Sequence, residues 1–227
     1  MDKYMNVLCN CPLFKGKEKK EIKDSLSRTE HKVIHYQKND FIFRADHTPA
    51  YLGIVLKGSI DVQNTLESGK YFNVFYKKKG EVFGGALVFS NIQNYKFNII
   101  AKTHCDILLI AKQSFLEVLA KDQIIVANIL NLLAKSVLML NHKIELFSHS
   151  SIQKKIAYSL LYNIQFNPHN TIHLPYSKKD WAEHLNVSRP SLLRELKKLV
   201  DAGIIAIDKK TIKVLQKDHL ASILNNP

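Results

Sequence analysis

The sequence has few cysteines and no long, uninterrupted apolar run. Its three cysteines, Cys9, Cys11 and Cys105, are an odd number among 227 residues, which does not indicate a disulfide framework. No stretch approaches the roughly 18 uninterrupted apolar residues of a transmembrane helix, and residues 1–10 lack the apolar core of a secretion signal. These absences predict a cytoplasmic protein without a membrane partner, whose cysteines are free thiols or ligands.

Motifs typical of enzymes are also missing. The sequence contains no P-loop, no dinucleotide-binding fingerprint, no nucleophile elbow and no pair of metal ligands at helical spacing. Its ten histidines show no compact ligand spacing. We therefore expect a protein that is not an enzyme and that holds no metal.

The composition is that of a folded, basic protein. Hydrophobic residues make up 46% and charged residues 23% of the chain, far from the composition of a disordered protein. The length favours two compact units. The net charge of +13 favours a polyanionic partner, either nucleic acid or an anionic membrane surface. The alternative is a soluble protein that is basic for no specific reason.

The first half of the chain has a strand pattern. Between His31 and Ala111 the apolar residues form short runs, separated by polar or glycine-bearing turns. Many short strands with closely spaced turns are typical of an antiparallel barrel or roll. The runs are Val33-Ile34, Phe41-Ile42-Phe43, Ile54-Val55-Leu56, Phe72 to Tyr76 and Ile107 to Ile110.

From Gln113 onward the apolar period is helical, and it continues for a long distance. Two apolar lines run side by side, which is too wide a stripe for one neighbour. One line can cover the roll while the other pairs with a second subunit in a coiled-coil-like dimer; the alternative is a helix buried only against its own domain. We assign the dimer interface to the line Ile125, Ile129, Leu132, Ser136 and Met139. The second line is Val126, Leu130, Leu133, Val137, Leu140, Ile144 and Phe147.

The run Ser148-His149-Ser150-Ser151 interrupts this pattern and is the predicted hinge. We therefore divide the chain into a sensor roll over residues 1–120, a dimerisation helix over 121–148 and a third domain over 149–227.

The third domain contains the signals of a helix-turn-helix. Ser177 followed by Asp180 is a capping-box pattern that starts a short helix. Asn186 tolerates the left-handed conformation that a tight turn between helices requires. Ser188 caps a second helix with Pro190 in its first turn, and Gly203 is well placed to end it.

The second helix has one apolar and one basic face. Leu192, Leu193, Leu196, Leu199 and Val200 are predicted to face inward, whereas Arg189, Ser191, Arg194, Lys197 and Lys198 lie opposite. A helix whose amino-terminal end meets DNA can send such side chains into the major groove, where arginine binds guanine bidentately. The alternative is a solvated helix face.

A basic hairpin follows and completes the winged motif. Ile204 to Ile207 and Thr211 to Val214 are predicted strands, joined by a tip that contains Lys209 and Lys210. From Ser150 onward there are twelve Lys and Arg against six Asp and Glu, so this domain is basic. We expect double-stranded DNA as its partner. The expected DNA-binding residues are Ser188, Arg189, Pro190, Ser191, Arg194, Lys178, Lys209 and Lys210.

Several segments, in the right order, resemble the Crp/Fnr family of bacterial transcription regulators over nearly the whole chain. The resemblance implies an α+β fold with an antiparallel β-roll of the jelly-roll type, a long dimerisation helix and a winged helix-turn-helix. It also implies a homodimer on a pseudo-palindromic operator and RNA polymerase as a partner. By this resemblance Ser188 and Ser191 meet phosphate, while Arg189 and Arg194 read bases. The matching segments are Cys11–Phe14 (entry), Leu56–Ile60 (first sensor hairpin), Gly80–Gly84 (phosphate cassette), Val187–Leu199 (recognition helix) and Gly203–Ile205 (exit to the wing).

The sequence departs from the branches of this family whose ligands are cyclic AMP or an iron–sulfur cluster. Gly85 stands where cyclic-nucleotide members have a glutamate, and Tyr95 and Lys96 stand where they have an arginine–serine pair. Lysine lacks the bidentate fork of arginine, so we do not expect cyclic AMP as the effector; another nucleotide remains an alternative. The expected effector pocket comprises Gly80, Glu81, Phe83, Gly84, Gly85, Tyr95 and Lys96.

The cysteines lack the pattern of a cluster site, because Cys9-x-Cys11 has the wrong spacing and a fourth ligand is missing. Pro190 replaces the glutamate of the cyclic-AMP branch, which predicts a different operator. We therefore predict a sequence-specific regulator controlled by an unidentified small molecule or redox signal. The alternative is a nucleotide-binding or protein-interaction module whose winged domain docks on a protein.

Overall fold

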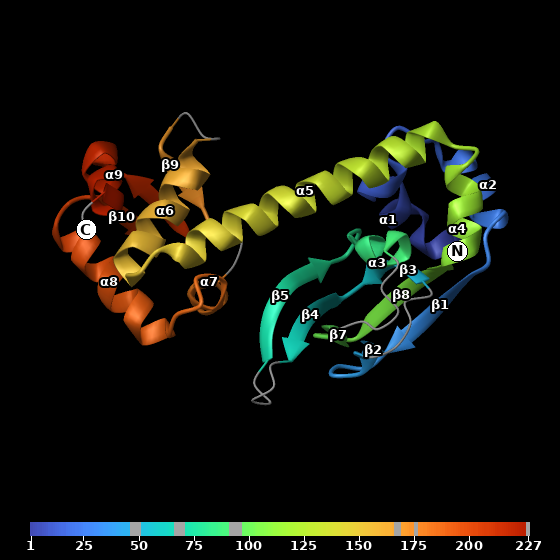
Figure 1. Cartoon of the computed structure of the whole chain (residues 1–227), viewed down its shortest axis with the longest axis horizontal. Helices are drawn as coiled ribbons and strands as arrows, with labels where there is room; N and C mark the ends of the chain where they lie inside the picture. Colours follow the sequence, from blue (N-terminus) through green and yellow to red (C-terminus); the bar gives the residue numbers. More distant parts are fainter. Residues whose placement is uncertain (46–50, 66–70, 91–96, 166–168, 175–176, 226–227) are drawn as a thin grey trace. The chain divides into compact units, whose positions relative to one another are not determined.

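The computed structural model describes residues 1–45, 51–65, 71–90, 97–165, 169–174 and 177–225 (Figure 1). The chain divides into two compact units, Met1–Ser136 and Val137–Pro227. Tyr95 and Lys96, two of the expected effector residues, lie outside the described residues.

The first unit is built on two antiparallel four-stranded sheets, which confirms the predicted roll (Figure 1). The first sheet has the order β1-β8-β3-β6, with β1 His31–Tyr36, β8 Cys105–Ala111, β3 Tyr51–Lys57 and β6 Val82–Phe83. The second has the order β2-β7-β4-β5, with β2 Phe41–Phe43, β7 Phe97–Ala101, β4 Ser59–Thr65 and β5 Tyr71–Lys78.

The first sheet is buried on both faces, because successive side chains of a strand point to opposite sides. In β8, Ile107 and Leu109 pack between the two sheets, whereas Leu108 and Ile110 pack against the helices. This double burial accounts for the continuous apolar run in β8. The helices of this unit are η1 Asp2–Tyr4, α1 Met5–Cys9, η2 Pro12–Phe14, α2 Lys19–Ser27, α3 Gly85–Phe89 and α4 Lys112–Leu119.

The predicted hairpin at Leu56–Ile60 is wrong. β3 pairs with β6 and β8, whereas β4 pairs with β5 and β7. The Lys57-Gly58 turn therefore carries the chain from one sheet to the other. Gly58 has φ +81, and a Cβ there would lie 2.2 Å from the His104 carbonyl oxygen, so this corner requires glycine.

The long helix α5, Gln123–Ser148, is separated from α4 by a break at residues 120–122. The Asp122 carboxylate accepts a hydrogen bond from the Ile125 amide at 3.1 Å. The Asn128 amide group donates to the carbonyls of Leu13 at 2.9 Å and Lys15 at 2.8 Å. The first bond caps α5, and the two Asn128 bonds fix its first turns against the segment that contains η2. By length and composition alone α5 could also cross a membrane.

The second unit forms one core from the end of α5 to the last helix. α5 ends at Ser148, and Ser151 caps the next helix, so the interruption predicted at 148–151 is confirmed. The three-stranded sheet of this unit has the order β10-β11-β9. Its elements are α6 Ile152–Ile164, β9 Thr171–His173, α7 Lys178–His184, α8 Arg189–Asp201, β10 Ile205–Asp208, β11 Thr211–Val214 and α9 Lys217–Asn225.

Candidate nucleic-acid interface and sensor interior

The first helix of the motif, α7, begins as the sequence predicts. The Ser177 hydroxyl accepts from the Asp180 amide at 3.2 Å, and the Asp180 carboxylate accepts from the Ser177 amide at 3.2 Å. This reciprocal capping box satisfies two amides that the helix leaves free. α7 buries Trp181 completely in the core, which fixes the helix against the unit.

The turn between α7 and α8 has the expected geometry. Asn186 has φ +53, in the left-handed region. The Val187 amide donates to the Ala182 carbonyl at 3.0 Å, which closes the turn. The Ser188 hydroxyl accepts from the Ser191 amide at 3.2 Å and donates to the Ser191 hydroxyl at 2.8 Å. The Ser191 hydroxyl proton is then free to donate outward, to a phosphate for example.

The faces of α8 largely follow the prediction. Leu192, Leu196 and Leu199 are buried, and Arg189, Pro190 and Arg194 are exposed. Leu193 and Val200, predicted to face inward, are 36% and 39% exposed. They lie at the edge of the apolar stripe, where the core does not reach.

Glu195 is a site residue that the sequence analysis missed. Its side chain is only 10% exposed, and one carboxylate oxygen lies 3.0 Å from the Lys198 ammonium and 3.5 Å from Arg194 Nε. Position 195 falls three residues after Leu192 and four before Leu199, both buried. Helical periodicity alone could therefore have indicated a buried carboxylate between two cations.

The wing forms as predicted. β10 and β11 pair from Ile205↔Val214 to Asp208↔Thr211, which leaves Lys209 and Lys210 at the tip, both exposed. Lys209 has φ +50, which the tight tip requires. β9 joins the far side of β11 through Ile172↔Ile212, and both side chains are buried. Lys178, at the start of α7, is half-buried.

A group of titratable residues packs between α5, α6 and α7 within the second unit. Tyr158 donates to the Glu145 carboxylate at 2.6 Å, and the Tyr158 hydroxyl lies 3.1 Å from His142 Nδ1. Burial, together with the positive charges of Lys143 and His142, lowers the pKa of His184 to about 4. This part of the unit therefore favours neutral imidazole at neutral pH.

The surroundings of Gly85 in the expected effector pocket are apolar. A Cβ on Gly85 would lie 3.6 Å from Ile129, 3.7 Å from Leu133 and 3.8 Å from Leu52, so this position faces hydrophobic side chains. Gly84 has φ +79, and a Cβ there would lie 3.0 Å from the Tyr51 carbonyl. This part of the site offers little to a ribose or a cyclic phosphate.

Phe83 fills the space between the sheets. Its side chain is 5% exposed and packs in the core between them. Its ring lies 5.8 Å from that of Phe43 and against Gly53, where a Cβ would lie 2.0 Å from the ring. Glu81 is held locally, because its carboxylate accepts from the Lys78 amide at 2.8 Å and lies 3.7 Å from the Lys77 ammonium. Gly80, with φ +86, completes this turn.

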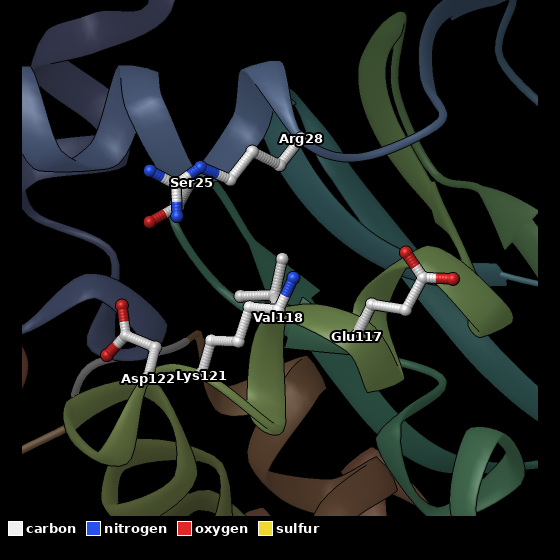
Figure 2. A pocket seen from close by; sticks show the side chains of 6 residues that line it. All are labelled: Ser25, Arg28, Glu117, Val118, Lys121 and Asp122. Atoms are coloured by element: carbon white, nitrogen blue, oxygen red, sulfur yellow. The ribbon is translucent and has the colours of Figure 1, made fainter.

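A small pocket lies elsewhere in the first unit, between α2 and the junction of α4 and α5 (Figure 2). Its volume of about 70 Å³ is far below the roughly 300–1,000 Å³ of small-molecule sites. It is lined by Arg28 and Lys121 but also by Glu117 and Asp122, so its charges balance. We assign it no ligand.

The three cysteines do not come together as one site. Cys9 is exposed, whereas Cys11 and Cys105 are buried. Cys11 packs among the helices of the first unit and Cys105 between its sheets, and burial raises the pKa of the Cys11 thiol to about 11. Cys105 donates to the Ser59 carbonyl at 3.0 Å. A buried thiol held in this way is unreactive.

The structure corrects the expected dimer interface. Ile125 and Ile129 are 1% and 3% exposed, within the core of the first unit. Leu132 packs against that core, and Ser136 and Met139 are half-buried. Ile125 and Ile129 therefore have almost no surface left for a partner, and these two residues face the core of the first unit.

Two sequence-family models cover most of the chain. The cyclic nucleotide-binding domain matches residues 33–122, and the Crp-like helix-turn-helix domain matches residues 154–223. The chain belongs to the Crp/Fnr family. Members of this family are DNA-binding transcription regulators, and those with the Crp-like helix-turn-helix act as dimers.

Individual relatives agree with this membership. The chain is 26% identical to the cAMP-activated global transcriptional regulator CRP of Pasteurella multocida over 190 residues, which are 81% of this chain and 90% of that protein. Two solved structures share the fold. The Thermus thermophilus catabolite activator protein has a TM-score of 0.54 at 20% identity and covers 94% of this chain and 98% of its own. CooA from Carboxydothermus hydrogenoformans has a TM-score of 0.68 at 15% identity, with coverages of 88% and 90%.

Proposed function

We propose that this Crp/Fnr member is a sequence-specific regulator that binds a pseudo-palindromic operator as a homodimer. The observation that carries the proposal is the outward face of α8. Ser188 and Ser191 stand at its amino-terminal end, and Arg189 and Arg194 are exposed on it. The Ser191 hydroxyl, whose proton is free to donate, suits a phosphate contact, and the guanidinium groups suit the edges of guanines. We assign contacts with the DNA backbone, on either side of α8, to Lys178, Lys209 and Lys210.

We assign the dimer contact to the second apolar line of α5. Leu130, Val137, Leu140, Ile144 and Phe147 are 58%, 56%, 38%, 68% and 44% exposed. Leu130, Val137 and Ile144 repeat every seven residues, and Leu140 and Phe147 follow Val137 and Ile144 by three residues. This is the a/d spacing of a left-handed coiled coil, and β-branched residues at a with leucine at d favour two parallel strands.

A parallel dimer of this kind fits the geometry of a palindromic operator. Its two-fold axis would relate the two copies of α8, which must enter successive major grooves about 34 Å apart. A signal in the roll would act by favouring one arrangement of the two helices over another. We propose an effector other than cyclic AMP, because Gly85 faces Ile129, Leu133 and Leu52. A cytoplasmic location and RNA polymerase as a partner complete the proposal.

Salt-dependent binding to duplex DNA tests this function. Phosphate contacts release counterions, so affinity should fall steeply, by roughly a thousandfold or more between 50 and 200 mM salt for six or more contacts. Replacing Lys209 and Lys210 with Ala should weaken binding to all sequences. Replacing Lys78 and Lys79, two exposed lysines at the end of β5 and in the turn after it, is the matched control and should leave binding unchanged. A flat salt response would favour a winged domain that docks on a protein.

A further inference from the structure

We infer that Glu195 is a positioning residue of the reading helix, which orients Arg194 for guanine and withholds Lys198 from the phosphates. This inference rests on the proposed function. Glu195 is 8% exposed in a unit whose other acidic residues are exposed or half-buried in the part that the structure describes. A buried carboxylate must keep its counter-charges, because an unpaired charge costs several kcal/mol in such surroundings.

The contact between Glu195 and Arg194 leaves the terminal amino groups of the guanidinium available to bind guanine. Only Nε lies on the Glu195 carboxylate, at 3.5 Å, and the Arg194 side chain is 68% exposed. The hydrogen bond uses Nε, so both terminal amino groups, which can form the fork that binds guanine O6 and N7, keep their donors for DNA. A restraint on Nε therefore limits the rotamers of Arg194 before DNA arrives, which lowers the entropic cost of the base contact.

The contact between Glu195 and Lys198 affects the sequence-independent attraction to DNA phosphates. Its ammonium lies 3.0 Å from the same carboxylate oxygen, and its side chain is 60% exposed. In this position the Lys198 charge is compensated within the protein, so it adds little to the sequence-independent attraction of phosphates. The carboxylate thus favours base-specific over non-specific binding.

The test compares Glu195→Gln with Glu183→Gln. Both variants remove one negative charge from the second unit, but Glu183 is an exposed residue of α7. Affinities are measured on the operator, on an operator changed at the base pair read by Arg194, and on random duplex, each at several salt concentrations. We expect Glu195→Gln to lower discrimination at that base pair by roughly tenfold. It should also steepen the fall of affinity with salt by about the amount that one additional phosphate contact contributes. Glu183→Gln should keep wild-type discrimination.

A double-mutant cycle separates positioning from a structural effect. In the Arg194→Ala background, Glu195→Gln should no longer change discrimination at that base pair, because the group it orients is gone. Glu195→Asp, which keeps the charge, should retain part of the wild-type preference. Equal discrimination in wild type and Glu195→Gln would overturn the inference while leaving the regulator intact. Wild-type protein without any operator preference would instead overturn the proposed function.

Discussion

The second unit exposes basic side chains on α8 and the wing, whereas the first unit surrounds Phe83 and Gly85, two residues of the expected effector pocket, with hydrophobic side chains. Arg189, Arg194 and the two wing lysines are exposed, while Phe83 packs between the sheets and Gly85 faces Ile129. In the residues that the structure describes, α8 and the wing thus present exposed basic groups, whereas the surroundings of Gly85 and Phe83 are hydrophobic.

This difference has a physical basis. Phosphates and base edges present the same chemistry to every DNA-binding protein, so the reading helix needs the same kinds of side chain. A sensor ligand has no such constraint, and a roll holds its shape through packing whatever it binds. The fold of the first unit is therefore compatible with ligands of different chemistry.

The largest expected effect concerns the helix that the two units share. Ile144→Glu places one charge in each of the two α5 helices of the proposed coiled coil. An unpaired buried charge costs about 3–5 kcal/mol. The dimer should dissociate in sedimentation experiments, with a dissociation constant raised at least a hundredfold. Leu138→Glu is the matched control, since Leu138 is 65% and Ile144 68% exposed but Leu138 lies off the heptad line. A dimer that survives Ile144→Glu would place the interface elsewhere.

A core substitution should separate the stabilities of the two units. Phe83→Ala removes a ring that fills the space between the two sheets, and such changes cost about 3–5 kcal/mol. Hydrogen exchange should quicken in the β-strands of the first unit and remain unchanged in α7 and α8. Equal protection in β3 and β8 of wild type and variant would mean that the roll does not depend on this ring.

Acidification should destabilise the second unit selectively. His184 has a pKa of about 4 in the folded protein against an ordinary value of 6.5, so between these values the unfolded state binds more protons. Stability is therefore complete above about pH 6.5 and falls as the pH drops toward 4, by on the order of 3 kcal/mol.

Trp181, the single tryptophan, reports on the unfolding of this unit. In urea titrations followed by its fluorescence, His184→Gln should reduce the loss of stability between neutral pH and about pH 4.5. His219→Gln, an exposed position, should keep it. An unchanged pH dependence in His184→Gln would assign the effect to other groups, His142 among them.

The smallest effect concerns one base pair. Arg194→Ala should relax preference at a single operator position by about 1–3 kcal/mol, because it removes a bidentate contact. Lys209→Ala should weaken operator and random DNA alike, since it removes a phosphate contact. Binding measured on operators with single-base changes distinguishes the two. Equal losses on operator and random DNA for Arg194→Ala would contradict its reading role.

Local signals predicted the second unit well. The capping box at Ser177, the left-handed Asn186 and the end of α8 near Gly203 each depend on a few neighbouring residues. The strands of the roll were predicted where apolar runs are dense, but β4 and β7 were missed. β4 reads Ser-Ile-Asp-Val-Gln-Asn-Thr, and its two buried hydrophobic residues alternate with polar ones.

The choice between the two lines of α5 could not be made from the sequence. Both lines have helical spacing, and only the packed structure shows that Ile125 and Ile129 face the roll. Helical spacing places Glu195 on the buried side of α8, between Leu192 and Leu199, but only the packed structure shows its contacts with Arg194 and Lys198. The proximity of Gly85 to Leu133 depends on where α5 crosses the roll, and no local pattern encodes that position.

Selection of bound sequences from a random DNA pool tests directly whether the protein reads DNA as a dimer through α8. The purified protein is used in reducing buffer without added ligand, and the bound duplexes are sequenced. A dimeric regulator should enrich a two-fold symmetric motif whose half-sites are about one helical turn apart, with guanines at the positions that Arg189 and Arg194 read. Enrichment of an asymmetric motif, or salt-independent binding without any motif, would contradict a dimeric regulator that reads DNA through α8.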